Sequence, residues 1–475
     1  MMELRSTLPV QSRSTIVALI VAAAFFMENL DGTVIATALP QMAVSFAESA
    51  IHISIGITAY MLTVAIFIPA SGWMADRFGT RTVFCGAIAV FTISSAACGL
   101  SPELYSFVAA RIVQGAAAAL MSPVGRLAVM RGTEKSDILR AAAIVTWPGL
   151  IAPVLGPPLG GFITTYASWR WIFFLNIPIG IAGILFALRF IEEHRASVQR
   201  PFDWKGFALT GAALGALMYG FDRIGVRDWA PAGVFILGGL AFGWAAMRHA
   251  ARHTHPLIDF SALQIQTFSV GIWAGILFRM AVGATPILLP LMFQRGFGMT
   301  AFASGMLTLG YAFGNIAMKP LTTPILRRFG FRTTLTGDVL LSGLCILACG
   351  FLSADTPWAL TMTLLIVTGG FRSLGLTGLF TLPFVDIAPQ QRGDATTLMN
   401  VVQQVGHGFG AAFASVALQA SLLLRGAGED SLTVGDFRAA FAAVAALGMF
   451  AFPYFYALPR EAGAEVSGHR RVAKS

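Results

Sequence analysis

The stretch GWMADRFGTR, residues 72–81, is a short polar loop between two long apolar segments. Its second part, DRFGTR at 76–81, returns as RRFGFR at 327–332, a displacement of 251 residues. The tripeptide ACG at 97–99 returns at 348–350 with the same displacement. Two separate motifs that recur at one fixed spacing indicate an internal repeat, so the sequence predicts two halves built on one plan.

The segments around this loop predict a membrane protein. Of the 475 residues 56% are hydrophobic and only 12% are charged, whereas about a quarter of a soluble domain is charged. Fourteen apolar segments lie between residues 15 and 458, each near the length of about 20 residues that a membrane-spanning helix needs. We therefore expect an all-α polytopic membrane protein with 14 transmembrane helices.

The repeat also predicts how these helices are divided. It matches spans 1–3 with spans 9–11, so each half has six spans and two further helices are inserted between the halves. We expect an N-terminal six-helix lobe at 1–192, inserted helices 7 and 8 with their linkers at 193–262, and a C-terminal six-helix lobe at 263–475. Parallel repeats with a site at their interface are a transporter architecture.

The net charge of +9 does not indicate a nucleic-acid partner, because the basic residues form no single patch and fall in short runs between apolar segments. With the N-terminus inside, the inner loops and both ends hold 23 of the 32 Lys and Arg residues, and the outer loops hold 6. Cytoplasmic loops carry such an excess. The distribution predicts that both termini are cytoplasmic, in a bacterial-type inner membrane.

The first span contains two carboxylates within FFMENLDGTVIATALP, residues 25–40. A carboxylate inside a membrane helix costs several kcal/mol unless it faces a partner or a water-filled cavity. Glu28 and Asp31 are three residues apart and therefore share one helix face. Such a face can take up and release protons, which makes both residues candidates for proton coupling.

Arg111 in span 4 is the expected partner of Asp31. Arg111 lies roughly 7 residues and Asp31 about 8 residues from the outer ends of their spans, which places both about 10–12 Å deep. Either charge alone would be costly there, so we predict a buried ion pair. The pair is either a static structural bridge or a gate that opens when the carboxylate is protonated.

Five motifs resemble one transporter family. The loop at 72–81 resembles the signature loop of the major facilitator superfamily, and RIVQG at 111–115 and GPPLGG at 156–161 resemble its span 4 and antiporter elements. LDGTVIATALP at 30–40 and WRWIFFLNIPIG at 169–180 resemble the fourteen-span drug:proton antiporter branch (EmrB/QacA-type), nearest to its MdtD-like members. The resemblance extends from about Phe25 to Leu422.

This resemblance implies the major facilitator fold and export of small amphipathic organic compounds in exchange for protons, by alternating access. It assigns conformational gating to the loop residues Gly72, Asp76, Arg77, Gly79 and Arg81. It assigns the antiporter motif to Gly156, Pro157, Gly160 and Gly161.

Polar residues of the family's cavity-lining spans are the candidate substrate contacts. In the second half the charges that we expect within spans are basic, Arg279 and Arg372, and Asn400, Gln403 and His407 form a stripe on one face of span 13. The stripe serves either ligand contact or hydrogen bonding between helices, and His407 either titrates or is packed. The candidates are Gln114, Trp147, Arg279, Tyr311, Asn315, Arg372, Asn400, Gln403 and His407.

No enzyme motif is present: the chain has no phosphate-binding Gly-x4-Gly-Lys-Ser/Thr loop and no local serine–histidine–acid set. We expect no cofactor. His249, His253 and His255 have a metal-like spacing, but we expect no metal site because only Asp259 offers a nearby carboxylate. The expected partners are the substrate, protons and the lipid bilayer; a periplasmic adaptor is left open.

Two other functions are compatible with the sequence. Uptake or uniport of a polar or anionic solute would suit the basic residues Arg279 and Arg372. A non-transporting membrane sensor or scaffold would need no titratable pair.

Overall fold

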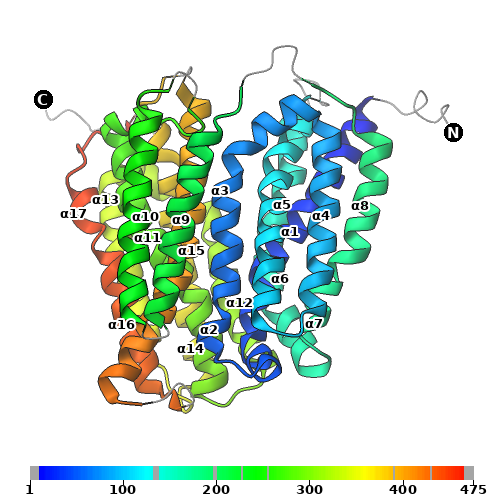
Figure 1. The fold of residues 1–475 in the computed structure, drawn as a ribbon. Coiled ribbons are helices and arrows are strands. Elements are labelled where there is room, and N and C mark those ends of the chain that lie inside the picture. Colours follow the sequence, from blue (N-terminus) through cyan, green and yellow to red (C-terminus); the bar gives the residue numbers. More distant parts are fainter. Residues whose placement is uncertain are drawn as a thin grey trace, which may run out of the picture.

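The computed structural model describes residues 10–131, 138–195, 201–225, 228–253, 256–388, 391–427 and 431–464. Within these ranges the regular structure is entirely helical, and eleven helices are long and apolar enough to cross a membrane. Figure 1 shows these helices roughly parallel, in a first bundle coloured blue to cyan and a second coloured yellow to red, with a green helix pair beside them. The prediction of an all-α polytopic fold is confirmed.

The helices of the first half follow the predicted spans. They are α1 (Val10–Phe46), the short α2 (Ala50–Ile53), α3 (Ile55–Phe78), α4 (Thr80–Leu100), α5 (Leu104–Arg131), α6 (Ile138–Tyr166), α7 (Arg170–Phe174) and α8 (Asn176–Phe190). The sixth predicted span is divided between α7 and α8. Helix α1 packs on α6, and α5 packs on both α3 and α4.

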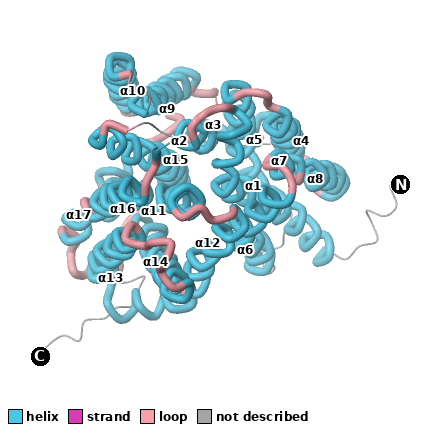
Figure 2. The backbone as a smooth tube through the Cα atoms, turned by 90° about the horizontal axis from the view of Figure 1, so that it is seen from below, coloured by secondary structure: helices cyan, strands magenta, loops and turns pink. Residues whose placement is uncertain are grey.

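The inserted pair is α9 (Trp204–Gly225) and α10 (Trp229–Ala250), which pack closely on each other. Helix α9 also contacts α3 of the first half and α15 (Arg392–Arg425) of the second. The pair therefore lies against a seam between the two bundles, on the outside of the molecule, as the view from below also shows (Figure 2).

The second half contains α11 (Gln266–Leu291), α12 (Ala301–Ala317), α13 (Lys319–Cys349), α14 (Trp358–Thr381), α15, α16 (Val434–Met449) and α17 (Phe452–Tyr456). Short helical turns are η2 (Ser261–Gln264), η3 (Met292–Gly296) and η4 (Leu382–Phe384). Helix α11 packs on α15, and α14 packs on α12 and α13. The predicted domain boundaries at 192 and 262 stay a prediction.

The tenth and eleventh apolar segments of the sequence, 302–326 and 333–353, are built from α12 and α13. The tenth continues past the end of α12 into the first part of α13, and the eleventh is the rest of α13. The chain turns between them at Gly330, where φ is 72° and ψ is 167°. Gly79, which the repeat pairs with Gly330, has φ 99° and ψ 144°. Both positions need a glycine because other residues rarely adopt positive φ, so the repeat extends to the backbone conformation.

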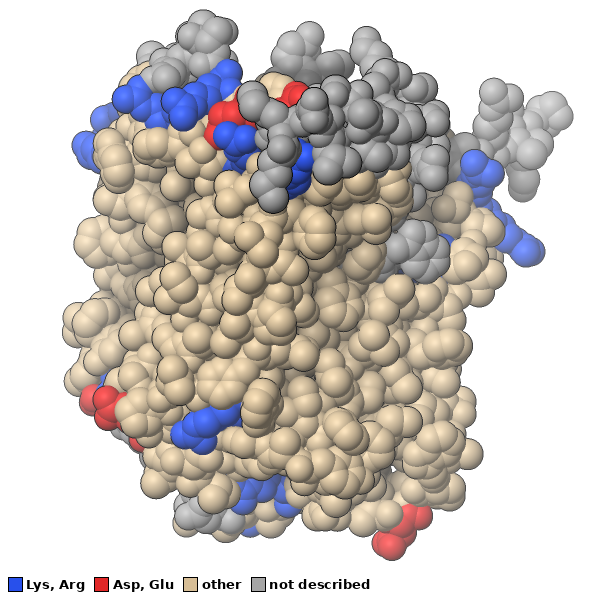
Figure 3. Space-filling model, turned by 90° about the vertical axis from the view of Figure 1, so that its right-hand side faces the viewer, with Lys and Arg blue, Asp and Glu red and all other residues tan. Residues whose placement is uncertain are grey.

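The surface agrees with a membrane environment. Charged side chains gather at the two ends of the helices, and the face shown in Figure 3 is largely uncharged between them. Large apolar side chains are exposed in the middle of helices, as with Ile93 of α4 and Leu237 of α10, which are 70% and 69% exposed. Exposed apolar side chains in this number are stable in lipid rather than in water.

The two halves meet at the end opposite the loop 72–81. Gln294 donates to the carbonyl oxygen of Thr37 at 3.2 Å, and the Phe302 amide donates to Thr165 Oγ1 at 3.0 Å. The hydroxyl oxygens of Ser54 and Ser415 lie 2.6 Å apart. These bonds join the two halves at this end of the molecule.

Candidate functional site

Asp31 lies in the interior of α1 and pairs with Arg111 of α5. Both side chains have no exposed surface, and Arg111 Nη1 lies 2.5 Å from Asp31 Oδ2. The sequence placed these two residues at one depth, and the structure places them in contact. Because a charge without a partner is costly at this depth, each residue compensates the charge of the other.

Two amides complete the surroundings of Asp31. Gln114 Nε2 donates to Asp31 Oδ1 at 3.0 Å, and Gln114 Oε1 accepts from Arg111 Nη1 at 2.7 Å. Asn176, the first residue of α8, donates to Asp31 Oδ1 at 3.3 Å and to Ser95 Oγ at 2.9 Å. The sequence analysis proposed Gln114 and missed Asn176, although Asn176 lies within the stretch 169–180 that resembles the antiporter branch.

Arg111 also contacts α3. Its Nε donates to the carbonyl oxygen of Gly56 at 3.4 Å, and its guanidinium carbon lies 4.1 Å from the centre of the Tyr60 ring. A cation over an aromatic face is attracted by the ring quadrupole. Arg111 Nη2 has no hydrogen-bond partner within the described part of the chain. One buried charge pair thus connects α1, α3, α5 and α8.

Glu28 occupies a different environment on the same face of α1. Its side chain is half-buried and accepts a hydrogen bond from Ser122 of α5. Since α1 runs from the end that carries the loop 72–81 toward the opposite end, Glu28 lies one turn nearer to that loop than Asp31 does. The two carboxylates therefore lie on one helix face at different depths in the membrane.

The loop 72–81 is held by the beginning of the linker that follows α8. The stretch expected as a loop is helical except at Gly79: α3 extends to Phe78, and α4 starts at Thr80. Glu193 accepts from the Arg81 amide at 3.1 Å and from Thr82 Oγ1 at 2.5 Å, and its Oε2 lies 3.8 Å from Arg81 Nε. A carboxylate at a helix N-terminus is favoured by the helix dipole. Glu193, which the sequence analysis did not single out, therefore anchors this loop.

The antiporter motif lies where α6 packs between α1 and α12. A Cβ atom on Gly160 would lie 2.6 Å from the carbonyl oxygen of Val34, and one on Gly161 would lie 2.9 Å from the carbonyl carbon of Ala301. Gly156 lies against Thr33 of α1 in the same way, and Gly305 of α12 lies against Pro157. The motif glycines therefore permit close contact of α6 with a helix of each half.

We expect Gly160→Ala to lower the free energy of unfolding by about 1–3 kcal/mol, because the added methyl group meets backbone that cannot move aside. Gly32→Ala in α1 is the matched control, since a Cβ there has no atom within 4 Å. Denaturant unfolding in detergent micelles measures both variants. Equal stability of the two would show that the close approach at Gly160 is unimportant.

The second half contains a counterpart of the arginine–tyrosine contact. The guanidinium carbon of Arg372 in α14 lies 5.2 Å from the centre of the Tyr311 ring in α12. The repeat displacement of 251 residues relates Tyr311 to Tyr60, whereas the position related to Asp31 is Val282. No carboxylate thus occupies the related position, and Arg372 Nε has no hydrogen-bond partner among the described residues.

Arg279 of α11 is fully buried. Its Nη2 lies 3.5 Å from both the carbonyl oxygen of Leu379 and the sulfur of Met399, and within the described residues its Nε and Nη1 have no hydrogen-bond partner. Lys319, which the sequence analysis counted with a cytoplasmic loop, lies at the start of α13 and donates to Thr377 Oγ1 at 3.2 Å.

The expectation that the charges within the second-half spans are only basic is wrong. Asp338 lies inside α13, is buried against α14, and its Oδ1 has no hydrogen-bond partner in the described chain. A carboxylate within the apolar run 333–353 is visible in the sequence.

The other predicted contacts lie on α12 and α15. Asn315 of α12 and Asn400, Gln403 and His407 of α15 are half-buried, and His407 Nε2 has no hydrogen-bond partner in the described part of the protein. The Trp147 side chain lies outside the described residues. The structure brings Asp31, Arg111 and Gln114 into one network, and Tyr311 and Arg372 into another.

Two repeated helical bundles with charged networks buried between their helices define a secondary transporter. The sequence profile of the Major Facilitator Superfamily matches residues 21–411 and also 271–474. The chain belongs to this family, and it is an integral membrane transporter rather than an enzyme.

Related proteins are similar in sequence to most of the chain. It is 36% identical over 406 residues to the putative multidrug resistance protein MdtD of Serratia proteamaculans, with 84% of each protein covered. It is 35% identical over 403 residues to the probable transport protein HsrA of Haemophilus influenzae, covering 84% of this chain and 87% of that protein. The resemblance to MdtD-like members is therefore confirmed.

Solved structures share the fold. A D-xylose–proton symporter has a TM-score of 0.65 at 13% identity, covering 94% of this chain and 98% of its own. A bacterial homologue of the human lysosomal transporter Spinster, in an inward-facing and occupied conformation, has a TM-score of 0.65 at 15% identity, covering 95% and 97%.

Proposed function

We propose that the protein is a proton-coupled antiporter that exports small amphipathic organic compounds. The observation that carries the proposal is the buried Asp31–Arg111 pair, with Gln114 and Asn176 bonded to the same carboxylate. A carboxylate in this setting can exist in two states, ionised and paired or protonated and released. The names of the MdtD relatives support a drug-like substrate.

The network links protonation to helix movement. Ionised Asp31 holds α1, α5 and α8 together through Arg111 and Asn176. Protonation removes the charge that attracts Arg111, so the hold on these helices weakens and the two bundles can rock about the central site. Glu28 lies one turn nearer the loop 72–81, and we assign it the first contact with protons that enter from that side.

A second candidate function is transport of an anionic or polar solute. It is favoured by the buried basic groups of the second half, Arg279 and Arg372, whose guanidinium nitrogens are only partly bonded within the described residues. An anionic substrate group could bind these nitrogens. Such a solute would cross the membrane by the same rocking movement of the two bundles, either inward or outward.

Substrate-induced proton release from the purified protein tests both candidates. We expect cationic or neutral amphipathic compounds to release protons into a weakly buffered solution, and Asp31→Asn to suppress the release. Release by anionic compounds alone would favour the second candidate. If a broad panel binds and no member releases protons, the antiport proposal is wrong.

Both termini and the loop 72–81 are proposed to face the cytoplasm. This loop, the first described turn of α1 and the last described residues near α17 lie at one end of the molecule (Figure 1), and the positive-inside distribution assigns that end to the cytoplasm. We expect a reporter fused after Ser475 to show cytoplasmic activity. Periplasmic activity of the reporter would contradict the orientation.

A further inference from the structure

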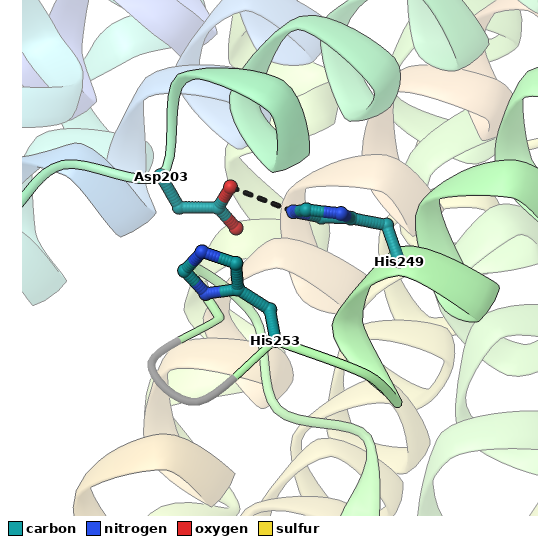
Figure 4. Close-up of side chains that lie close together, drawn as sticks. All are labelled: Asp203, His249 and His253. Carbon is teal, nitrogen blue, oxygen red and sulfur yellow. Dashed lines mark hydrogen bonds and ion pairs between the residues drawn. The ribbon is translucent and has the colours of Figure 1, made fainter.

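Three potential metal ligands meet beside the inserted helix pair. Asp203 precedes α9, His249 lies in the last turn of α10, and His253 follows that helix (Figure 4). One ligand atom of each residue lies within 4.8 Å of those of the other two. The histidine spacing alone did not reveal this group, because the third member is 46 residues away from His249 in the sequence.

Asp203 is a fixed, ionised carboxylate. Its Oδ1 accepts from the Gly206 amide at 2.8 Å, and its Oδ2 accepts from the Leu257 amide at 3.2 Å. Burial acts to raise the pKa of Asp203, but these two amides and His249 outweigh it, so that the pKa lies below its ordinary value. The carboxylate is therefore deprotonated and oriented before any cation arrives.

The imidazoles lie on the open side of this carboxylate. His249 Nε2 is 2.8 Å from Asp203 Oδ1, and the ring centres of His249 and His253 are 5.0 Å apart. Both histidines are half-buried, so solvent reaches the group. Two imidazoles and one carboxylate match the ligand set of zinc, with bond lengths of about 2.0–2.2 Å and a fourth position for water.

We propose that Asp203, His249 and His253 form a binding site for Zn²⁺ or a similar first-row divalent cation. On binding, the hydrogen bond between His249 and Asp203 is replaced by two bonds to the metal, and the His249 proton moves to Nδ1 or to solvent. A side-chain movement of His253 then brings its ring nitrogen to the bond length of zinc.

At this position a bound cation would affect the movement of the two halves of the protein. Asp203 ends the connector from the first half, and Leu257, bonded to Asp203, begins the segment that leads to η2 and α11. A metal at this point ties both connectors to α10 and restrains the movement of the two bundles. The binding of the metal does not depend on what the protein transports, whereas the slowing of transport by the metal rests on the proposed function.

Metal titration of the purified full-length protein tests the site. We expect one equivalent of Zn²⁺ to bind, and Co²⁺ to show the visible d–d bands of tetrahedral coordination. His253→Ala and Asp203→Asn should each weaken binding by at least about tenfold. His52→Ala is the matched control, because His52 pairs with Glu48 at 3.0 Å at the opposite end of the molecule, and it should bind metal as the unaltered protein does.

His253→Ala keeps the Asp203 cap of α9, so its thermal unfolding without metal should match that of the unaltered protein. The proposal is overturned if neither Zn²⁺ nor Co²⁺ binds, or if binding is the same in His253→Ala. Zinc should slow transport in the unaltered protein and not in His253→Ala. If zinc binds but does not slow transport, only the proposed mechanical effect is refuted. If the protein shows no transport even without metal, that result concerns the proposed function alone.

Discussion

Asp31→Asn is expected to abolish accumulation of substrate against its gradient while substrate binding is retained. Asparagine has nearly the same shape as aspartate and can still accept hydrogen bonds from Gln114 and Asn176, but it cannot carry a proton or a negative charge. In proteoliposomes with an imposed pH gradient, we expect the concentration ratio across the membrane to fall to about 1, since nothing then couples proton and substrate movement.

Two other carboxylates are the controls for this result. Glu28→Gln should be milder and should shift preference toward less cationic compounds, because Glu28 is half-buried and bonded to Ser122 instead of to an arginine. Glu48→Gln, beyond the end of α1, should have no effect on coupling. If Asp31→Asn still accumulates substrate, Asp31 is not the coupling residue, and Glu28, Asp338 or His407 takes its place in the proposal.

Arg111→Gln is expected to destabilise the protein by about 3–5 kcal/mol, because it leaves the buried Asp31 charge without its partner. The double variant Asp31→Asn/Arg111→Gln should regain most of this loss, since it removes both charges together. Denaturant unfolding in micelles of the four proteins gives the coupling between the two residues. Effects that add to within about 0.5 kcal/mol would show that the pair is energetically unimportant.

The helices and the central pair follow from local sequence features. The span positions required only apolar length, and the Asp31–Arg111 contact required only that two costly charges share one depth. The repeat predicted two halves built on one plan, and the positive φ of both Gly79 and Gly330 agrees with it. These features can be predicted from the sequence because the membrane restricts both the length of each helix and the depth of its charged residues.

Other contacts between distant segments could not be predicted in this way. Asn176, Glu193 and Asp203 each bond to partners that the spacing of residues does not indicate, and their positions depend on how separate helices pack. Span 10 extends to Phe329, slightly past the apolar segment that ends at 326, because the helix continues through the basic residues Arg327 and Arg328. Such features can be identified only once the packing of the helices is known.

Simultaneous recording of proton and substrate movement in vesicles tests the central claim of proton-coupled antiport most directly. Proteoliposomes are prepared with a substrate gradient and no imposed pH gradient, and internal pH is followed with a trapped dye. We expect substrate moving down its gradient to drive protons in the opposite direction, and Asp31→Asn to remove this proton movement. Substrate flux without proton flux, or protons moving in the same direction as substrate, would contradict it.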